Sequence, residues 1–312
     1  MTQGTATGGA AQTPPAGRIR PTLHGSQLRG ARLTLDEKAA LAGTYGYPGL
    51  DFTLAEVRAY PGGPEGVRAL LAREGLQAAT VGGVFGARLT DASDAEFDAA
   101  LGEVKAAAQT VVACGGARSG TGLSSRAERP RDALWPLVVD RLRRLDDALD
   151  GTGVRLGVEF LGVKTLYPQR PHVFVQSMAE ANRLLEAAGA RNIGLTLDSY
   201  HWYAGGDTLE TIRQTPAARI TLLHVNDAKD VPRERLDDQD RVMPGEGVIP
   251  LADWLAAIAA TGFEGYIALE VLGPRLAGLS PAECARLGKA AIDGLLAGPL
   301  AGDRPGRGLR PS

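Results

Sequence analysis

Residues 192–227 read NIGLTLDSYHWYAGGDTLETIRQTPAARITLLHVND and contain two short apolar runs that each end at a side chain able to bind a metal ion. The first run, Ile193 to Leu197, is followed by Asp198, and the second, Ile220 to Leu223, is followed by His224. Apolar runs of about four to eight residues separated by a helical segment are typical of strand–helix–strand units in a parallel sheet. Polar side chains just beyond the carboxyl ends of such strands lie where ligands bind in α/β folds. This stretch therefore predicts two parallel strands that present ligand-type side chains at the same end.

The same alternation of strands and helices extends over most of the chain. Capping boxes such as Thr34–Glu37 and Ser93–Glu96 predict helix starts, because their side chains satisfy each other's free backbone N–H groups. Strands are predicted at residues 21–24, 49–52, 77–84, 110–114, 154–160, 193–197, 220–223 and 266–271. Eight strands alternating with helices predict an α/β protein with one domain, a (β/α)8 TIM barrel over residues 19–296. A doubly wound open sheet is the structural alternative.

The ends of the chain and its composition narrow the class of protein. We expect residues 1–18, which are small, polar and rich in Pro and Gly, to form a disordered tail, and residues 297–312 to form a loose C-terminal tail. The net charge of −2 gives no basic footprint for nucleic acid or for an anionic membrane, and no apolar run is long enough to cross a membrane. Cys114 and Cys284 are too few for a disulfide framework and have no CxxC spacing, so we expect a cytoplasmic protein.

One side chain of metal-ligand type lies at the end of each of the last four predicted strands. These side chains are Glu159, Asp198, His224 and Glu270. Each alone is more typical of an ordinary salt bridge, but in a closed barrel the four strand ends converge on one mouth. Buried carboxylates there are costly unless a cation lies between them. Three carboxylates and one imidazole suit Mn²⁺, Mg²⁺ or Co²⁺ better than a structural Zn²⁺ site, so the pattern predicts a single divalent metal ion.

Five motifs together resemble those of the xylose isomerase-like superfamily of sugar isomerases and epimerases, which includes ketose 3-epimerases and inosose dehydratases or isomerases. They are VEFLG with Glu159, LDSYHW with Asp198 and His201, LHVND with His224, DRVMPGEGVIPL with Arg241, and IALEV with Glu270. The resemblance extends from about Pro21 to Gly294 and is sharp from Val154 onward. It implies one divalent metal ion, most often manganese, held by residues matching Glu159, Asp198, His224 and Glu270. It also implies that residues matching His201 and Arg241 hold substrate oxygens.

The chemistry expected of such a site is proton transfer next to a carbonyl group. A divalent metal ion acts as a Lewis acid that stabilises the enediolate left when the neighbouring C–H is deprotonated. Glu159 and Glu270 would flank the substrate, one removing a proton and the other returning one. His201 and Arg241 would donate hydrogen bonds to the developing oxyanion. The expected substrate is a small sugar, sugar phosphate or cyclitol.

Several other residues are weaker candidates for the same mouth. Trp202 is predicted either to form an apolar wall for a sugar or simply to pack in the core, and Lys164 to contact substrate or to be a solvated loop charge. His24 ends the first predicted strand and is expected to line the pocket. Asp227 is expected to orient a neighbour of the ligands. The acidic run at residues 237–240 is predicted to be a solvated loop rather than a second metal site.

Other functions remain open on the sequence alone. A lyase would use the same first step and then eliminate water from an inosose-like keto-polyol. An apurinic-type endonuclease would hold a trinuclear zinc cluster, for which the four histidines of the chain are few. A noncatalytic sugar-binding subunit would be favoured by loss of a ligand, and all four are present. The sequence leaves the oligomeric state open, a homo-oligomer included.

Overall fold

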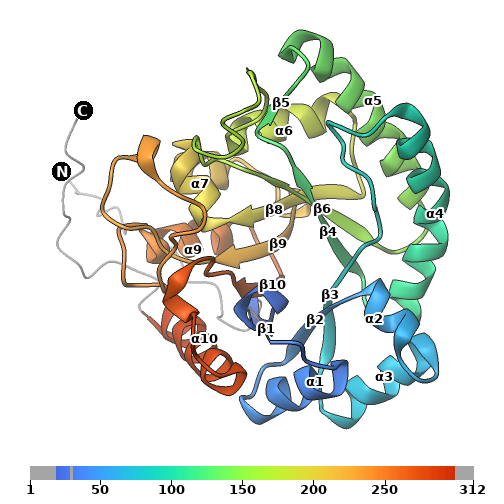
Figure 1. Cartoon of the computed structure of the whole chain (residues 1–312), viewed down its shortest axis with the longest axis vertical. Helices are drawn as coiled ribbons and strands as arrows, with labels where there is room; N and C mark the ends of the chain where they lie inside the picture. Colours follow the sequence, from blue (N-terminus) through green and yellow to red (C-terminus); the bar gives the residue numbers. More distant parts are fainter. Residues whose placement is uncertain (1–18, 29–30, 299–312) are drawn as a thin grey trace, which may run out of the picture.

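The structure, a computed structural model, describes residues 19–28 and 31–298 and contains one eight-stranded sheet (Figure 1). Its strands are β1 (Ile19–Leu23), β2 (Gly49–Thr53), β3 (Gln77–Gly82), β4 (Arg118–Leu123), β6 (Arg155–Phe160), β8 (Ile193–Asp198), β9 (Ile220–Val225) and β10 (Gly265–Leu269). The strand order is β3-β2-β1-β10-β9-β8-β6-β4, and every paired neighbour is parallel. A short antiparallel pair, β5 (Arg126–Ala127) with β7 (His172–Val173), lies outside this sheet.

The sheet curls into a nearly closed barrel. The first strand, β1, pairs with β2 on one side and with the last strand, β10, on the other. The two ends of the ladder, β3 and β4, pack against each other. The predicted single-domain TIM barrel is therefore confirmed. The alternative of an open doubly wound sheet is wrong, because such a sheet would keep its two edge strands, here β3 and β4, apart.

Helices surround the barrel on the outside, as Figure 1 shows. The α-helices are α1 (Leu35–Thr44), α2 (Leu54–Ala59), α3 (Gly63–Arg73), α4 (Asp94–Ala113), α5 (Arg131–Leu149), α6 (Met178–Ala187), α7 (Ser199–Gly205), α8 (Leu209–Arg213), α9 (Leu251–Ala260) and α10 (Pro281–Ala297). Short 3₁₀ helices are η2 (Gly25–Leu28), η3 (Ala217–Arg219), η4 (Arg233–Arg235) and η5 (Pro274–Leu276). Every residue of β8 and β9 is buried, because helices cover their outer face and barrel side chains fill the inner one.

The predicted helix starts are set by local hydrogen bonds. Thr34 and Glu37 form both bonds of a capping box at the start of α1, and Ser93 and Glu96 do the same at α4. Each such cap stabilises its helix by about 1 kcal/mol. These caps fix where each helix begins and so how long each connection to the preceding strand is.

The fourth predicted strand was wrong. Residues 110–113 form the end of α4 and Cys114 is its C-cap; the Thr110 hydroxyl donates to the carbonyl of Ala106 one turn earlier. The β-branched run TVVAC suggested a strand, but Gly115, with a φ of 84°, ends the helix just after it. The actual strand is β4, with the sequence RSGTGL. Apart from Leu123, its residues are small or polar, so it lacks the apolar run that identified the other strands.

Small residues inside the barrel make room for the side chains at its mouth. A Cβ atom on Gly157 of β6 would lie only 2.4 Å from Thr196 Oγ1 of β8. A side chain at position 157 would therefore face the barrel interior. The side chain of Glu159, two residues further along the same strand, faces the same way. By the same period of two, Asp198 lies on the face of β8 that carries Thr196. The pleat of the strands thus directs both carboxylates into one mouth.

The predicted tails fall largely outside the described residues. Residues 1–18 and 299–312 are not described, and α10 extends to Ala297, which the sequence had assigned to the tail. Within the described part of the chain, no helix is both long and apolar enough to cross a membrane.

Candidate metal centre and active site

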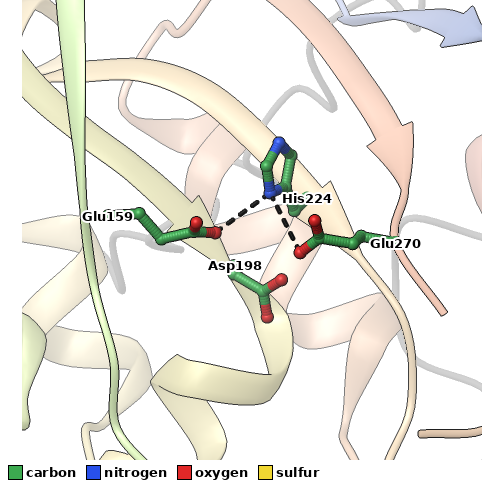
Figure 2. A group of neighbouring side chains, drawn as sticks. All are labelled: Glu159, Asp198, His224 and Glu270. Atoms are coloured by element: carbon green, nitrogen blue, oxygen red, sulfur yellow. Dashed lines mark hydrogen bonds and ion pairs between the residues drawn. The ribbon is translucent and has the colours of Figure 1, made fainter. Parts of the chain in front are cut away.

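Four side chains from different strands meet at the carboxyl-terminal mouth of the barrel (Figure 2). They are Glu159 near the end of β6, Asp198 at the end of β8, His224 in β9, and Glu270 directly after β10. One donor atom of each lies within 4.8 Å of the donor atoms of the other three. The predicted convergence of the four ligand-type residues is what the structure shows.

The imidazole of His224 lies between two of the carboxylates. Its Nδ1 atom is 3.0 Å from Glu159 Oε1 and 3.4 Å from Glu270 Oε2. Burial disfavours the charged imidazolium, but the carboxylates of Glu270 and Glu159 outweigh burial and raise the pKa of His224 well above its usual range. Burial raises the pKa of Glu270. The neighbouring His224, Arg241 and His24 outweigh burial and hold the pKa of this carboxyl well below normal. The cluster therefore carries negative charge balanced by cations around it.

Asp198 is completely buried and held from several sides. Its Oδ1 atom accepts from the backbone N–H groups of Tyr200 and His201, so Asp198 caps α7. The Asn226 amide donates to both carboxylate oxygens, at 3.3 and 3.0 Å, and also to the carbonyl of Glu270. A carboxylate with this many donors has a single orientation, which suits a metal ligand. The role of Asn226 was not predicted; its signal in the sequence is a polar residue between His224 and Asp227.

Arg241 lies in the loop between η4 and α9, and its guanidinium packs against the ligand cluster. Its guanidinium is 1% exposed and donates to Asp198 Oδ2 at 2.9 Å, to Glu270 Oε2 at 3.2 Å and to Asp238 Oδ1 at 2.7 Å. Burial would lower the pKa of Arg241, but the carboxylates of Asp198, Glu270 and Asp238 together raise it. Arg241 is therefore a permanent positive charge in contact with two candidate ligands.

His201 and Asp238 complete this buried layer. His201 Nε2 lies 3.2 Å from Arg241 Nη2, and because arginine only donates, Nε2 is the acceptor and the proton sits on Nδ1. Among the described residues, His201 Nδ1 has no hydrogen-bond partner although it is buried. The prediction that residues 237–240 form a solvated loop is wrong for Asp238, which is 8% exposed, because it pairs with Arg241.

The cluster has an open side and a closed side. The side chains of Glu159 and Glu270 are 20% and 15% exposed, whereas Asp198 is fully buried. Solvent can therefore reach the two glutamates but not Asp198. This difference separates side chains that can touch a substrate from those that hold the cluster together.

His24 joins the open side of the cluster. Its Nδ1 atom lies 2.8 Å from Asp51 Oδ2, and the Thr22 hydroxyl donates to Asp51 Oδ1. His24 Nε2 lies 3.9 Å from Glu270 Oε1, and its ring centre is 5.1 Å from that of His224. The prediction that His24 faces this mouth agrees with these contacts. Asp51 was not predicted, and its signal is an ionisable residue inside the apolar run GLDF.

Two other predicted candidates lie elsewhere. Trp202 is 3% exposed and donates its indole N–H to the carbonyl of Thr208, which corresponds to the packing alternative. Lys164 is about half exposed and pairs with Glu234, which corresponds to the solvated loop charge. Neither side chain has a contact with the four ligand-type residues among the interactions of the described chain.

Asp227 organises the loop that follows Arg241. Its two carboxylate oxygens accept from the backbone N–H groups of Ala228, Gly245, Gly247 and Ile249. A backbone bridge between Asp227 and Val242 fixes the start of the same loop. Burial raises the pKa of Asp227, and these N–H groups oppose that rise. Asp227 therefore holds the backbone segment next to Arg241, and Arg241 in turn contacts the ligand cluster.

The donor set fits a divalent cation. Three carboxylates and the Nδ1 atom of His224 point at one another, and this hard set matches Mn²⁺, Mg²⁺ or Co²⁺. Thiolates, which favour structural zinc, do not take part, because Cys114 and Cys284 are not among the four. The four residues therefore form a candidate metal-binding site.

Curated relatives with similar sequences act on small molecules. The inosose isomerase of Bacillus subtilis is 32% identical over 151 residues, which is 48% of this chain and 52% of that protein. The 3-dehydroshikimate dehydratase of Pseudomonas aeruginosa is 30% identical over 137 residues, or 43% of this chain and 20% of that protein. The chain thus spans about half the length of the inosose isomerase it matches, and the relatives include both isomerases and dehydratases.

Solved structures and a protein-family model agree on the fold. A xylose isomerase domain protein from Alicyclobacillus acidocaldarius has a TM-score of 0.81 and 29% identity, covering 89% of this chain and 98% of that one. The IolI protein with a bound zinc atom has a TM-score of 0.76 over the same shares of the two chains, and its 21% identity shows the fold alone. The family model "Xylose isomerase-like TIM barrel" matches residues 39–292. The resemblance noted in the five sequence motifs is confirmed, and the chain belongs to the xylose isomerase-like TIM barrel family.

Proposed function

We propose that this protein is a divalent-metal-dependent isomerase or epimerase that transfers a proton at the carbon next to a carbonyl group of a keto sugar or keto polyol. The observation that carries the proposal is the convergence of Glu159, Asp198, His224 and Glu270 at one barrel mouth, with the two glutamates accessible. Relatives named as isomerases support the class of reaction.

Glu159 and Glu270 carry out the proton transfer in this proposal. Glu159 and Glu270 come from strands that are not neighbours in the sheet, so they reach the mouth from different sides and can act on the two faces of one carbon. Glu270 is kept ionised by its lowered pKa, which suits an anionic metal ligand. Glu159, Asp198, His224 and Glu270 would hold a divalent ion, manganese in our proposal, and its chemistry would be Lewis-acid stabilisation of negative charge on the substrate.

The remaining residues position the reacting groups. His24 faces the open side, and its Asp51 partner fixes the ring orientation, so we assign His24 to a substrate hydroxyl. His201 is 1% exposed and its Nε2 accepts from Arg241, so we assign His201 to holding Arg241 within the buried layer instead of contacting a substrate oxygen. Arg241 stabilises Asp198 and Glu270 and makes the site less negative.

Relatives named as dehydratases favour a second candidate, a lyase. Removal of the same proton would be followed by loss of a hydroxyl group from the next carbon as water. The residues that remove the proton are the same in both candidates. Only the fate of the intermediate differs.

Deuterium exchange distinguishes these reactions. The protein is supplied with Mn²⁺ in heavy water and incubated with a panel of ketoses and inososes. We expect deuterium at the carbon next to the carbonyl, followed by an epimer or positional isomer. A product lighter by one water would establish the lyase, and hydride transfer without solvent deuterium would overturn both candidates.

A further inference from the structure

A cavity lies at the amino-terminal end of the barrel, opposite the candidate metal site. Its volume is about 420 Å³, and its lining includes Arg20, Arg68, Arg118, Leu71 and Tyr266. Arg118 is the first residue of β4, and Arg20 and Tyr266 are each the second residue of their strands. Because all paired strands of the barrel are parallel, this end is remote from the candidate metal site. The cavity therefore belongs to a different site.

Tyr266 holds two arginines at the cavity. The guanidinium carbons of Arg20 and Arg118 lie 4.4 and 5.9 Å from the centre of its ring. The Tyr266 hydroxyl and Arg20 Nη1 both donate to Gln77 Oε1, each at 2.6 Å. Tyr266 itself is 3% exposed. Two positive charges are thus held in place by an aromatic face and a neutral amide.

The positive charge continues across the end of the barrel. Arg155 is the first residue of β6, and Arg219 directly precedes β9. Burial, then repulsion by Arg118 and Arg219, lowers the pKa of Arg155 against the attraction of Asp146. Burial and repulsion by Arg20 lower the pKa of Arg118, with Tyr266 acting in the other direction. These guanidinium groups are close enough to repel one another.

The hydrogen bonds of these arginines leave much of this charge in place. Arg118 donates to the carbonyl of Glu264 at 3.2 Å, and Arg155 to the carbonyls of Arg191 and Ala218. Arg219 Nη1 is buried and has no hydrogen-bond partner among the described residues. Carbonyl groups are dipoles and do not cancel a formal charge. A ligand with negative charge would relieve the repulsion.

Carboxylates lie close by but not in the cavity wall. Glu65 on α3 is near enough to help burial raise the pKa of Cys114, which is part of the lining. Glu264 follows Phe263 at the edge of the same region and has interactions of its own. The described lining nevertheless contains three arginines and no Asp or Glu.

We propose that this cavity binds the phosphate group of a small organic phosphate. A guanidinium group can donate two parallel hydrogen bonds to two oxygens of one phosphate. A phosphate dianion also neutralises more of the three guanidinium charges than a carboxylate can. Leu71, Leu76 and the Tyr266 ring provide apolar surface for the organic part. The volume also exceeds what a bare ion needs and falls in the usual range of about 300–1,000 Å³ for small-molecule sites.

The test measures binding to the full-length protein by titration calorimetry at constant ionic strength. The probes are inorganic phosphate, phenyl phosphate and acetate. We expect one phenyl phosphate per chain, weaker binding of inorganic phosphate, and no binding of acetate at the same concentration. Equal heats from phosphate and acetate would overturn the proposal, because they would reflect charge screening alone.

Matched variants on one helix locate the site. Arg68 and Arg73 are both exposed on α3, but only Arg68 lines the cavity. Arg68→Gln is expected to weaken phenyl phosphate binding about ten-fold, the size typical of one lost charged hydrogen bond, and Arg73→Gln to leave it unchanged. Arg118→Gln should weaken phenyl phosphate binding at least as much. Because Arg118 lies in a barrel strand and Arg68 is exposed on a helix, Arg68→Gln tests the site without disturbing the barrel.

Two results would overturn the assignment to this cavity. One is equal weakening by Arg68→Gln and Arg73→Gln. The other is binding that survives Arg68→Gln but disappears in Asp198→Ala, since the phosphate would then sit at the candidate metal site. The proposed isomerase activity is not part of this readout, so either proposal can fail without the other.

Discussion

Arg241 donates to Asp198 across 2.9 Å, and neither side chain is more than 1% exposed. A fixed cation therefore touches a candidate metal ligand from its buried side. The metal site and folding stability are linked at this contact, because the guanidinium holds the Asp198 carboxylate in one orientation whether or not its other side has a partner.

Arg241→Ala is expected to lower the free energy of unfolding by about 3–5 kcal/mol, because it leaves Asp198 and Asp238 buried without their partner. Urea denaturation of the metal-free protein measures this. The matched control is Arg275→Ala, which removes a partly exposed pair with Glu246 and should change stability by less than about 1 kcal/mol. Similar values for the two variants would contradict the assignment of Arg241 to a stabilising buried ion pair.

One divalent ion per chain is expected after dialysis against trace metals, and Asp198→Ala should remove it by deleting a ligand. Elemental analysis measures the metal content. The control is Asp240→Ala, which changes an exposed carboxylate paired with Lys229 and should leave the content unchanged. Two or three zinc ions per chain would contradict the single-ion site.

Metal binding is expected to release a proton from His224, because its raised pKa keeps the imidazole protonated in the metal-free protein and a ligating imidazole must be neutral. Calorimetry in buffers of different ionisation enthalpy counts the protons released. The apparent metal affinity should rise with pH until the folded-state pKa is passed. An affinity independent of pH would contradict this assignment.

The same pKa has a consequence for stability. The pKa of His224 in the folded protein is raised above its ordinary value of 6.5, so protonated His224 stabilises the metal-free protein. This stabilisation is fully present below pH 6.5 and is lost as the pH rises through the folded-state pKa. The stability difference between wild type and His224→Gln, measured with chelator present, should therefore shrink as pH rises. A difference that grows with pH would reverse the sign of the argument.

Asp51→Asn is expected to lower kcat/KM by about ten-fold while leaving metal content intact, because Asp51 orients His24 and contacts none of the four ligands directly. Steady-state kinetics on the substrate found by deuterium exchange, together with elemental analysis, separate the two effects. Loss of the metal in this variant would show that the His24 and Asp51 pair supports the ligands instead of the substrate.

The barrel and the ligand ring were predictable because their signals are local. Each of the later strands is an apolar run that ends at a ligand-type residue, and the period of two places Glu159 and Asp198 on inward faces. The strand β4 was not predictable in the same way, because Gly120 and Gly122 leave no apolar run to find. The end of α4, which directly precedes β4 in the sequence, carries the β-branched residues instead.

The buried layer under the ligands was harder to predict for a different reason. Asp238 and Arg241 lie in a polar segment whose composition is that of a solvated loop, and only the tertiary fold brings them to Asp198. Asp51 was hidden by its position inside a strand. Long-range ion pairs of this kind leave no periodic trace in the sequence, so their partners emerge only from the structure.

Three strands connect the two ends of the barrel in a regular way. Arg155, Arg219 and Tyr266 lie at the beginning of β6, β9 and β10, and Glu159, His224 and Glu270 lie at or just beyond the other end of the same strands. The barrel is therefore polarised along its axis, with carboxylates at one mouth and guanidinium groups at the other. The two proposed sites therefore differ in the sign of the ligand that they accept, a cation at the carboxylate mouth and an anion at the guanidinium end.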